Sequence, residues 1–139
     1  MYILDTDTLT HLHAGHPRVV ANLHNVEDPD VVITVITKIE LLRGRFDFVL
    51  KAETGAGLLR AQHLLARTED LLAQLQVLAA DATAIAYFDR LRLQSNLRKI
   101  GRSDLLIASI TLAQRATLVT RNIRHFRQFP GLTVVNWVD

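Results

Sequence analysis

The chain has 139 residues, of which 49% are hydrophobic and 22% are charged, as in an ordinary globular protein. Its net charge of +2 permits nucleic-acid binding without requiring it. The absence of cysteine excludes disulfides and thiolate metal sites. No apolar run approaches the roughly 18 residues that span a bilayer, and the N-terminus lacks the pattern of a signal peptide. We therefore expect a cytoplasmic protein with no membrane partner.

Short apolar runs alternate with helical patterns along the whole chain. Strands are predicted at residues 2–5, 31–34, 76–79, 117–120 and 132–136. Helices are predicted at residues 8–13, 18–25, 34–43, 58–75, 82–99 and 104–114. This alternation, without a linker or an internal repeat, predicts an α/β fold in one domain over residues 1–139. The domain should have a central parallel sheet of about five strands with helices on both faces.

Polar residues and glycines predict several element boundaries. Asp7 is expected to cap the first helix, and Ser103 the helix at 104–114. Gly44 should end or kink the helix that starts at residue 34; residues 46–51 are compatible with its continuation, which the glycines at 55–57 should break. Residues 28–30, Asp-Pro-Asp, predict a turn.

Acidic residues follow or precede several of the predicted strands. Asp5 ends the first strand, Glu40 lies on the helix after the second, and Asp104 opens the helix before the fourth. Thr120 and Asn122 end that fourth strand. Singly, each acid is explained by helix capping or by an exposed ion pair. Together at one sheet edge they would repel one another unless a cation neutralised them, and Mg²⁺ or Mn²⁺ suits oxygen ligands.

Four blocks in order resemble the successive motifs of the PIN-domain family, and more narrowly the VapC-type toxin ribonucleases of type II toxin–antitoxin systems. The blocks are YILDTDTLT, ITVITKIELLRG, GRSDLLIASITLA and ATLVTRNIRHFRQFPGL. The resemblance covers residues 1–137. It implies that Asp5, Glu40 and Asp104 are catalytic and hold metal, and that Asn122 occupies a fourth catalytic position where many members have an acid.

The resemblance also implies a function. We expect an Mg²⁺-dependent endoribonuclease, with Mn²⁺ as a substitute, that hydrolyses RNA phosphodiesters with metal-activated water. Its expected partners are RNA, a second copy in a homodimer, and a cognate antitoxin that blocks the site with a basic side chain. Accessory residues near the site would be Thr6, Asp7, Ser103 and Thr120. The basic side chains expected along the RNA backbone, unless they only meet solvent or protein, are Arg98, Lys99, Arg102, Arg121 and Arg124.

Three other interpretations of the sequence are possible. The ILDTDT segment resembles haloacid-dehalogenase-like phosphatases, in which Asp5 would be a nucleophile and Asp7 a general acid, but the chain has few of the lysines that such sites need. A PIN-like fold could instead be a non-catalytic binding module. His11, His13 and His16 suggest zinc, although alternate residues face different sides of a helix.

Overall fold

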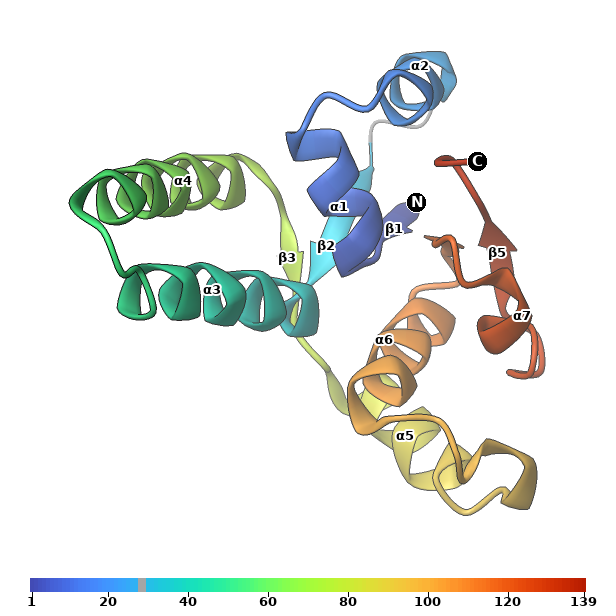
Figure 1. Ribbon diagram of the computed structural model, residues 1–139. Helices are drawn as coiled ribbons and strands as arrows, with labels where there is room; N and C mark the ends of the chain where they lie inside the picture. The colour runs from blue at the N-terminus through green and yellow to red at the C-terminus, as the bar shows by residue number, and fades with distance from the viewer. Residues whose placement is uncertain (28–29) are drawn as a thin grey trace.

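The computed structural model describes residues 1–27 and 30–139, so the turn predicted at 28–30 lies mostly outside the described residues. Five strands form one sheet in the order β3-β2-β1-β4-β5, and all neighbours are parallel (Figure 1). The strands are β1 (Tyr2–Leu4), β2 (Val31–Thr34), β3 (Val77–Leu78), β4 (Thr117–Val119) and β5 (Thr133–Val135). The predicted five-stranded parallel sheet is confirmed.

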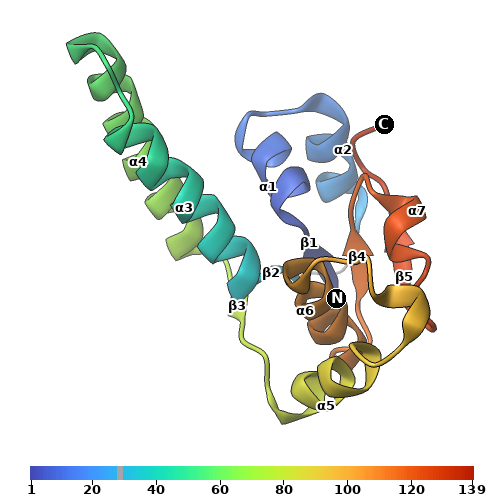
Figure 2. The same cartoon turned by 60° about the horizontal axis from the view of Figure 1, so that its bottom comes forward.

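Helices connect the strands and cover the sheet. They are α1 (Thr6–His13), α2 (Pro17–Asn25), α3 (Val35–Leu50), α4 (Gly55–Gln74), α5 (Ala82–Leu91), α6 (Arg102–Ala113) and α7 (Ile123–Phe126), with a 3₁₀ turn at Ser95–Leu97. In Figure 2 the hairpin of α3 and α4 extends away from the sheet. None of the helices within the described ranges is long and apolar enough to cross a bilayer.

Successive residues of the central strand β1 supply two separate cores. Ile3 packs in a cluster with residues of α5, α6 and α7, whereas Leu4 packs in a cluster with residues of α1, α2, α3 and α4. Both side chains are fully buried. Because neighbouring side chains on a strand point to opposite faces, this division confirms that helices cover both faces of the sheet.

The predicted long helix over residues 82–99 is wrong. α5 ends at Leu91, and the chain then forms the 3₁₀ turn before α6 begins. Leu91 and Leu97 are both buried in the same cluster. A continuous helix would place these two residues about 120° apart around its axis, on different faces. The break therefore lets both leucines enter one core.

Three predicted boundaries also differ. α3 continues through Gly44 to Leu50. A β-carbon built on Gly44 would meet no atom within 4 Å, so no close contact requires a glycine there. An isolated glycine costs a helix only about 1 kcal/mol, so flanking packing overrides it. α4 begins at Gly55, because the Thr54 hydroxyl accepts a hydrogen bond from the amide of Gly57. Ser103 lies in the first turn of α6 and is not its cap.

The strand order creates a switch point between β1 and β4. From β1 the sheet grows towards β2 and β3 on one side, and towards β4 and β5 on the other. Leu4 pairs with Val119, so the next residues, Asp5 and Thr120, leave the sheet side by side. Open α/β sheets bind ligands beyond the carboxyl ends of strands at such a point.

Candidate active site

A pocket of about 290 Å³ opens beyond the carboxyl ends of β1 and β4. It brings together all four predicted catalytic residues with two of the predicted accessory residues. The lining consists of Asp5, Thr6, Asp7, Glu40, Asp104, Ile107, Arg121, Asn122 and Phe126. Residues from four separate segments of the chain therefore meet at the predicted edge of the sheet.

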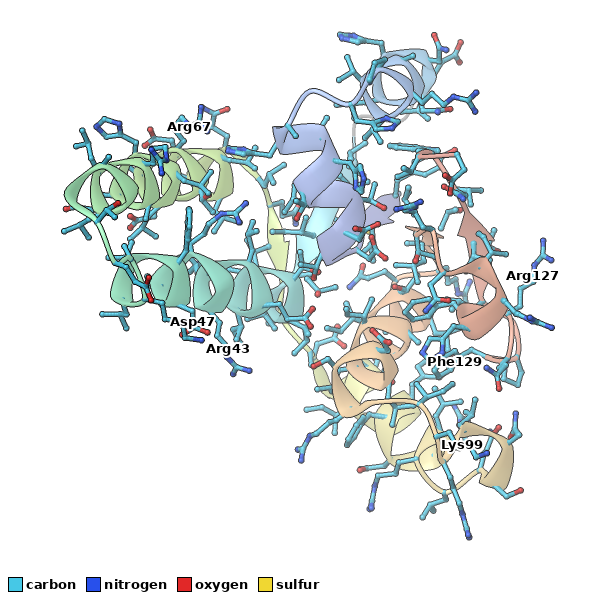
Figure 3. The ribbon with its side chains drawn as sticks, in the orientation of Figure 1. Arg43, Asp47, Arg67, Lys99, Arg127 and Phe129 are labelled. Carbon is cyan, nitrogen blue, oxygen red and sulfur yellow. The ribbon has the colours of Figure 1, made fainter. Side chains whose placement is uncertain are left out.

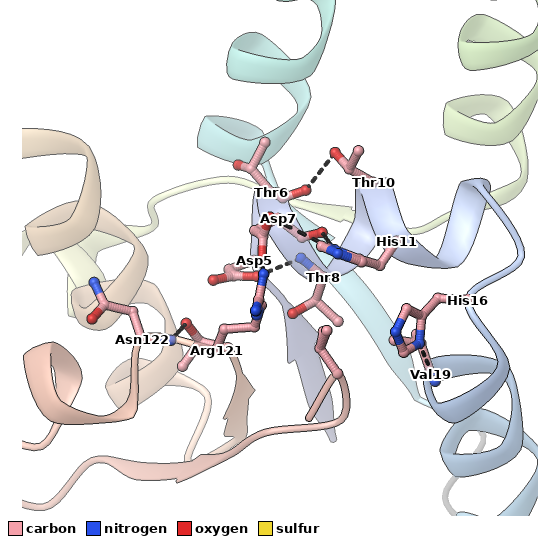
Figure 4. A network of polar contacts seen from close by, with 12 residues as sticks. Asp5, Thr6, Asp7, Thr8, Thr10, His11, His16, Val19, Arg121 and Asn122 are labelled. Atoms are coloured by element: carbon pink, nitrogen blue, oxygen red, sulfur yellow. Dashed lines mark hydrogen bonds and ion pairs between the residues drawn. The ribbon is translucent and has the colours of Figure 1, made fainter.

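Asp5 is the residue between β1 and α1, and its backbone is extended. It caps α1, because its Oδ1 accepts a hydrogen bond of 2.8 Å from the amide of Thr8 (Figure 4). Asp7, the predicted cap, lies within the first turn instead. Burial raises the pKa of Asp5 above its ordinary value, while hydrogen bonds from Thr120 and Thr8 oppose the rise. Asp7 is the like charge that adds to it, so burial outweighs carboxylate repulsion in setting this pKa.

Thr120 connects the ends of the strands beneath Asp5. Its side chain is fully buried and hydrogen-bonds to Asp5, and its hydroxyl oxygen accepts a bond of 3.0 Å from the amide of Asn122. The buried Thr8 hydroxyl donates to the carbonyl of Val119 at 3.1 Å. These bonds tie the start of α1 to the end of β4. They fix the floor of the pocket.

Glu40 reaches the pocket from α3. That helix begins directly after β2, where the Thr34 hydroxyl accepts a hydrogen bond from the amide of Thr37. The Thr6 hydroxyl donates to Oε1 of Glu40 at 2.7 Å and lies 3.3 Å from the hydroxyl of Thr37. A threonine hydroxyl has one proton, and the shorter distance assigns it to the carboxylate. α1 therefore orients the acid on α3.

Asp104 lies in the first turn of α6, and its Oδ2 is 3.0 Å from Nε2 of His125 on α7. This distance suits an ion pair, but the contact does not meet the geometry of a hydrogen bond, and Nε2 has no hydrogen-bond partner among the described residues. His125 was not among the predicted site residues. An Asn-x-x-His spacing on a helical turn is the signal that could have identified it.

Arg121 forms the rim of the pocket. Its Nε and Nη2 donate to the two carboxylate oxygens of Asp139 at 3.2 and 3.3 Å. Its Nη1 lies 4.0 Å from Oδ2 of Asp7. The other carboxylate oxygen of Asp7, Oδ1, lies 3.6 Å from Nδ1 of His11. The pairing with Asp139 raises the pKa of Arg121, so the guanidinium is charged at every physiological pH. A permanent positive charge therefore stands beside the carboxylates.

The other predicted basic residues lie outside the lining of this pocket. Arg124 lines a neighbouring cavity with Asn122 and His125. Lys99 lies on the segment between α5 and α6, near the bottom of the view in Figure 3, and its side chain is exposed. Arg98, Arg102 and Ser103 are exposed, and the guanidinium of Arg102 lies over the ring of Phe88.

The donor set has the chemistry of a hard-cation site. The pocket offers carboxylate and amide oxygens, the ligands that Mg²⁺ prefers, without sulfur. Within residues 1–27 and 30–139, however, no three acidic or histidine side chains approach closely enough to hold one ion together. Mg²⁺ keeps several waters and needs only one or two direct carboxylates, so this spacing fits an ion held partly through water.

The phosphatase interpretation fits this pocket poorly. The lining of the pocket includes no lysine, and phosphatases of this kind need a lysine near the nucleophilic carboxylate. Asp7, the proposed general acid, pairs with His11 and Arg121 at the rim.

Comparisons with known proteins give the family. The PIN domain model matches residues 2–132. The chain is 30% identical to Ribonuclease VapC2 of Rickettsia felis over 99% of this chain and 98% of the relative, and 26% identical to the tRNA(fMet)-specific endonuclease VapC of Salmonella typhimurium over 98% and 97%. It superposes on a chain of VapBC2 from Rickettsia felis, crystallised with a DNA fragment from the promoter, with a TM-score of 0.77 and 30% identity over 98% of both chains. The chain belongs to the PIN domain family and, within it, to the VapC-type ribonuclease toxins of toxin–antitoxin systems.

Proposed function

We propose that this protein is a divalent-metal-dependent endoribonuclease and the toxin of its own toxin–antitoxin pair. One observation carries the proposal: carboxylates from the start of α1, from α3 and from α6 line one pocket at the switch point of the sheet. The ribonuclease names of its relatives support the substrate class. Structural capping explains Asp5 alone, but it does not explain why Glu40 and Asp104 line the same pocket.

Mg²⁺ is the proposed cofactor, with Mn²⁺ as a substitute, because the donors are oxygen atoms. Asp5, Glu40 and Asp104 would hold the ion directly or through water. When bound, the ion supplies Lewis-acid chemistry: it lowers the pKa of a water molecule for attack on phosphorus and stabilises charge on the phosphate oxygens.

The protein's own groups bind and orient the RNA in this proposal. The guanidinium of Arg121 attracts a backbone phosphate at the rim, where its charge does not depend on pH. The side chain of Asn122, which also lines the pocket, positions water or phosphate. The fixed floor beneath Asp5 holds that carboxylate in one orientation while substrate enters.

A cognate antitoxin is the proposed regulator. The Rickettsia felis relative was crystallised as VapBC2 rather than as VapC alone. An antitoxin side chain that carries a positive charge would fit among three carboxylates and exclude the cation. A homodimer, which the family resemblance implies, is a further prediction.

Induced expression of the wild type and of Asp5→Asn, with growth and total RNA followed together, tests the proposal. We expect the wild type to arrest growth and fragment RNA, and Asp5→Asn to do neither. Asp81→Asn is the matched control, because it removes a carboxylate that caps α5 outside the pocket. Harmless expression of the wild type, together with no binding of Mn²⁺ by the purified protein, would favour a non-catalytic binding module.

A further inference from the structure

His125 holds a buried nitrogen beside one of the three candidate metal-binding acids. Its Nε2 has almost no exposure to solvent and lies 3.0 Å from Oδ2 of Asp104. Asp104 itself is more accessible, with 39% of its side chain exposed, against 25% for His125. Asp104 lines the pocket and His125 does not, so the histidine contacts this carboxylate from outside the pocket lining.

The imidazole has little freedom to move away from this position. Its ring packs edge-on against Phe126 with centroids 5.2 Å apart, and Phe126 stacks on Phe129. Both phenylalanines are buried. The carbonyl of His125 also accepts a hydrogen bond of 3.2 Å from the side chain of Gln128. A ring held on a buried aromatic cluster is suited to support a neighbour.

The other two acids of the pocket have comparable support. Asp5 receives a hydrogen bond from the amide of Thr8, and Glu40 receives one from the hydroxyl of Thr6. In each case the donor contacts one carboxylate oxygen. The corresponding partner of Asp104 is Nε2 of His125, which lies 3.0 Å from Oδ2.

We propose that His125 is a positioning residue that orients the carboxylate of Asp104 for the divalent cation. The inference rests on the proposed function, because it presupposes that Asp104 helps to hold the ion. Nε2 can donate both in the imidazolium and in the neutral tautomer that carries its proton there, so the role does not depend on the charge of the ring. Carboxylates that bind metals are themselves usually hydrogen-bonded, and losing such a partner typically costs 10- to 100-fold in metal affinity.

Titration of the metal-free protein with Mn²⁺, followed by the loss of the free-ion electron paramagnetic resonance signal, tests this role without RNA. We expect His125→Ala to weaken Mn²⁺ binding by about 10- to 100-fold. His125→Gln places an amide N–H near the former Nε2, so it should stay within about threefold of the wild type. His63→Ala, which removes an exposed histidine on α4, is the control for loss of any histidine.

Thermal unfolding without metal checks that each variant is folded. If His125→Ala fails this check, His125→Leu replaces it, because leucine better preserves packing on Phe126. Wild-type affinity in the alanine or leucine variant would overturn the inference, and so would His125→Gln binding as weakly as His125→Ala. Absence of saturable Mn²⁺ binding in the wild type would overturn the proposed function, and this inference with it.

Discussion

The hydroxyl of Thr6 donates to the carboxylate of Glu40 at 2.7 Å and links α1 to α3 across the pocket. A hydrogen bond to a charged group contributes about 1.5–3 kcal/mol. Thr6→Val keeps the shape of the side chain and removes the donor. We expect kcat/KM for RNA cleavage to fall at least about 10-fold, the change that corresponds to the lower limit of this energy range.

Thr6→Ser is the matched variant for this prediction, because it retains the hydroxyl. It should recover most of the wild-type rate in the same cleavage assay. Equal losses in the valine and serine variants would mean that the methyl group, rather than the hydrogen bond to Glu40, is what the site requires.

Asp5→Asn should make the protein more stable at neutral pH although it removes a candidate catalytic group. Burial raises the folded-state pKa of Asp5 above its ordinary value of 3.8. The folded protein therefore binds this proton more tightly than the unfolded chain, and stability falls as pH rises through the folded pKa. Asparagine does not ionise, and its Oδ1 can still accept the bond from Thr8.

Unfolding midpoints measured in EDTA from neutral pH downwards test the sign of this effect. The excess stability of Asp5→Asn should be largest at neutral pH and shrink as the pH approaches 3.8. Asp139→Asn is the comparison, because a hydrogen bond from Asn136 lowers the pKa of Asp139, and this variant should gain no stability at neutral pH. A less stable Asp5→Asn would contradict the assignment of burial as the dominant cause.

Arg121→Ala should weaken RNA binding in a salt-dependent way. One lost phosphate contact to a single strand reduces the slope of log affinity against log salt by about 0.7. Fluorescence anisotropy with a single-stranded RNA, in an Asp5→Asn background that prevents cleavage, measures this slope. Arg92→Ala removes an arginine that pairs with Asp89 on α5, and it should leave the slope unchanged. Identical slopes for both alanine variants would remove Arg121 from the proposed RNA contacts.

Asp81→Ala should destabilise the protein and spare its activity. Oδ1 of Asp81 accepts a hydrogen bond of 2.9 Å from the amide of Ala84 and caps α5. Loss of such a cap costs about 1 kcal/mol of the free energy of unfolding, which denaturant titration can measure. RNA cleavage below the unfolding transition should match the wild type. A large loss of cleavage would mean that the packing of α5 against α6 shapes the pocket.

The parallel sheet and the position of the pocket were predictable because both follow from local patterns. Apolar runs mark the strands, and a polar residue directly after a buried strand, such as Asp5, must emerge at the carboxyl edge. The end of α5 was not predictable in this way. It depends on Leu91 and Leu97 entering one core, and that is a property of the packed molecule.

The supporting contacts of the pocket were also beyond local patterns. His125 and Asp104 are 21 positions apart, and Arg121 and Asp139 are 18 apart; their contacts depend on how separate elements pack. Thr6 was predicted only as an accessory residue, because nothing in its neighbourhood indicates Glu40 as the acceptor. The sequence indicates that the acids lie near the carboxyl edge of the sheet, whereas the packing of the helices determines which donor contacts each acid.

Cleavage of a single-stranded RNA by purified protein at increasing Mg²⁺ or Mn²⁺ tests whether the pocket is a metal-dependent nuclease site. The wild type should cleave only with metal and stop when EDTA is added. Asp104→Asn and Glu40→Gln should remain folded and lose at least about 100-fold in rate, because each removes a charge that would hold the ion. Cleavage that persists in EDTA would contradict metal dependence, and an Asp104→Asn protein that cleaves at the wild-type rate would contradict the assigned site.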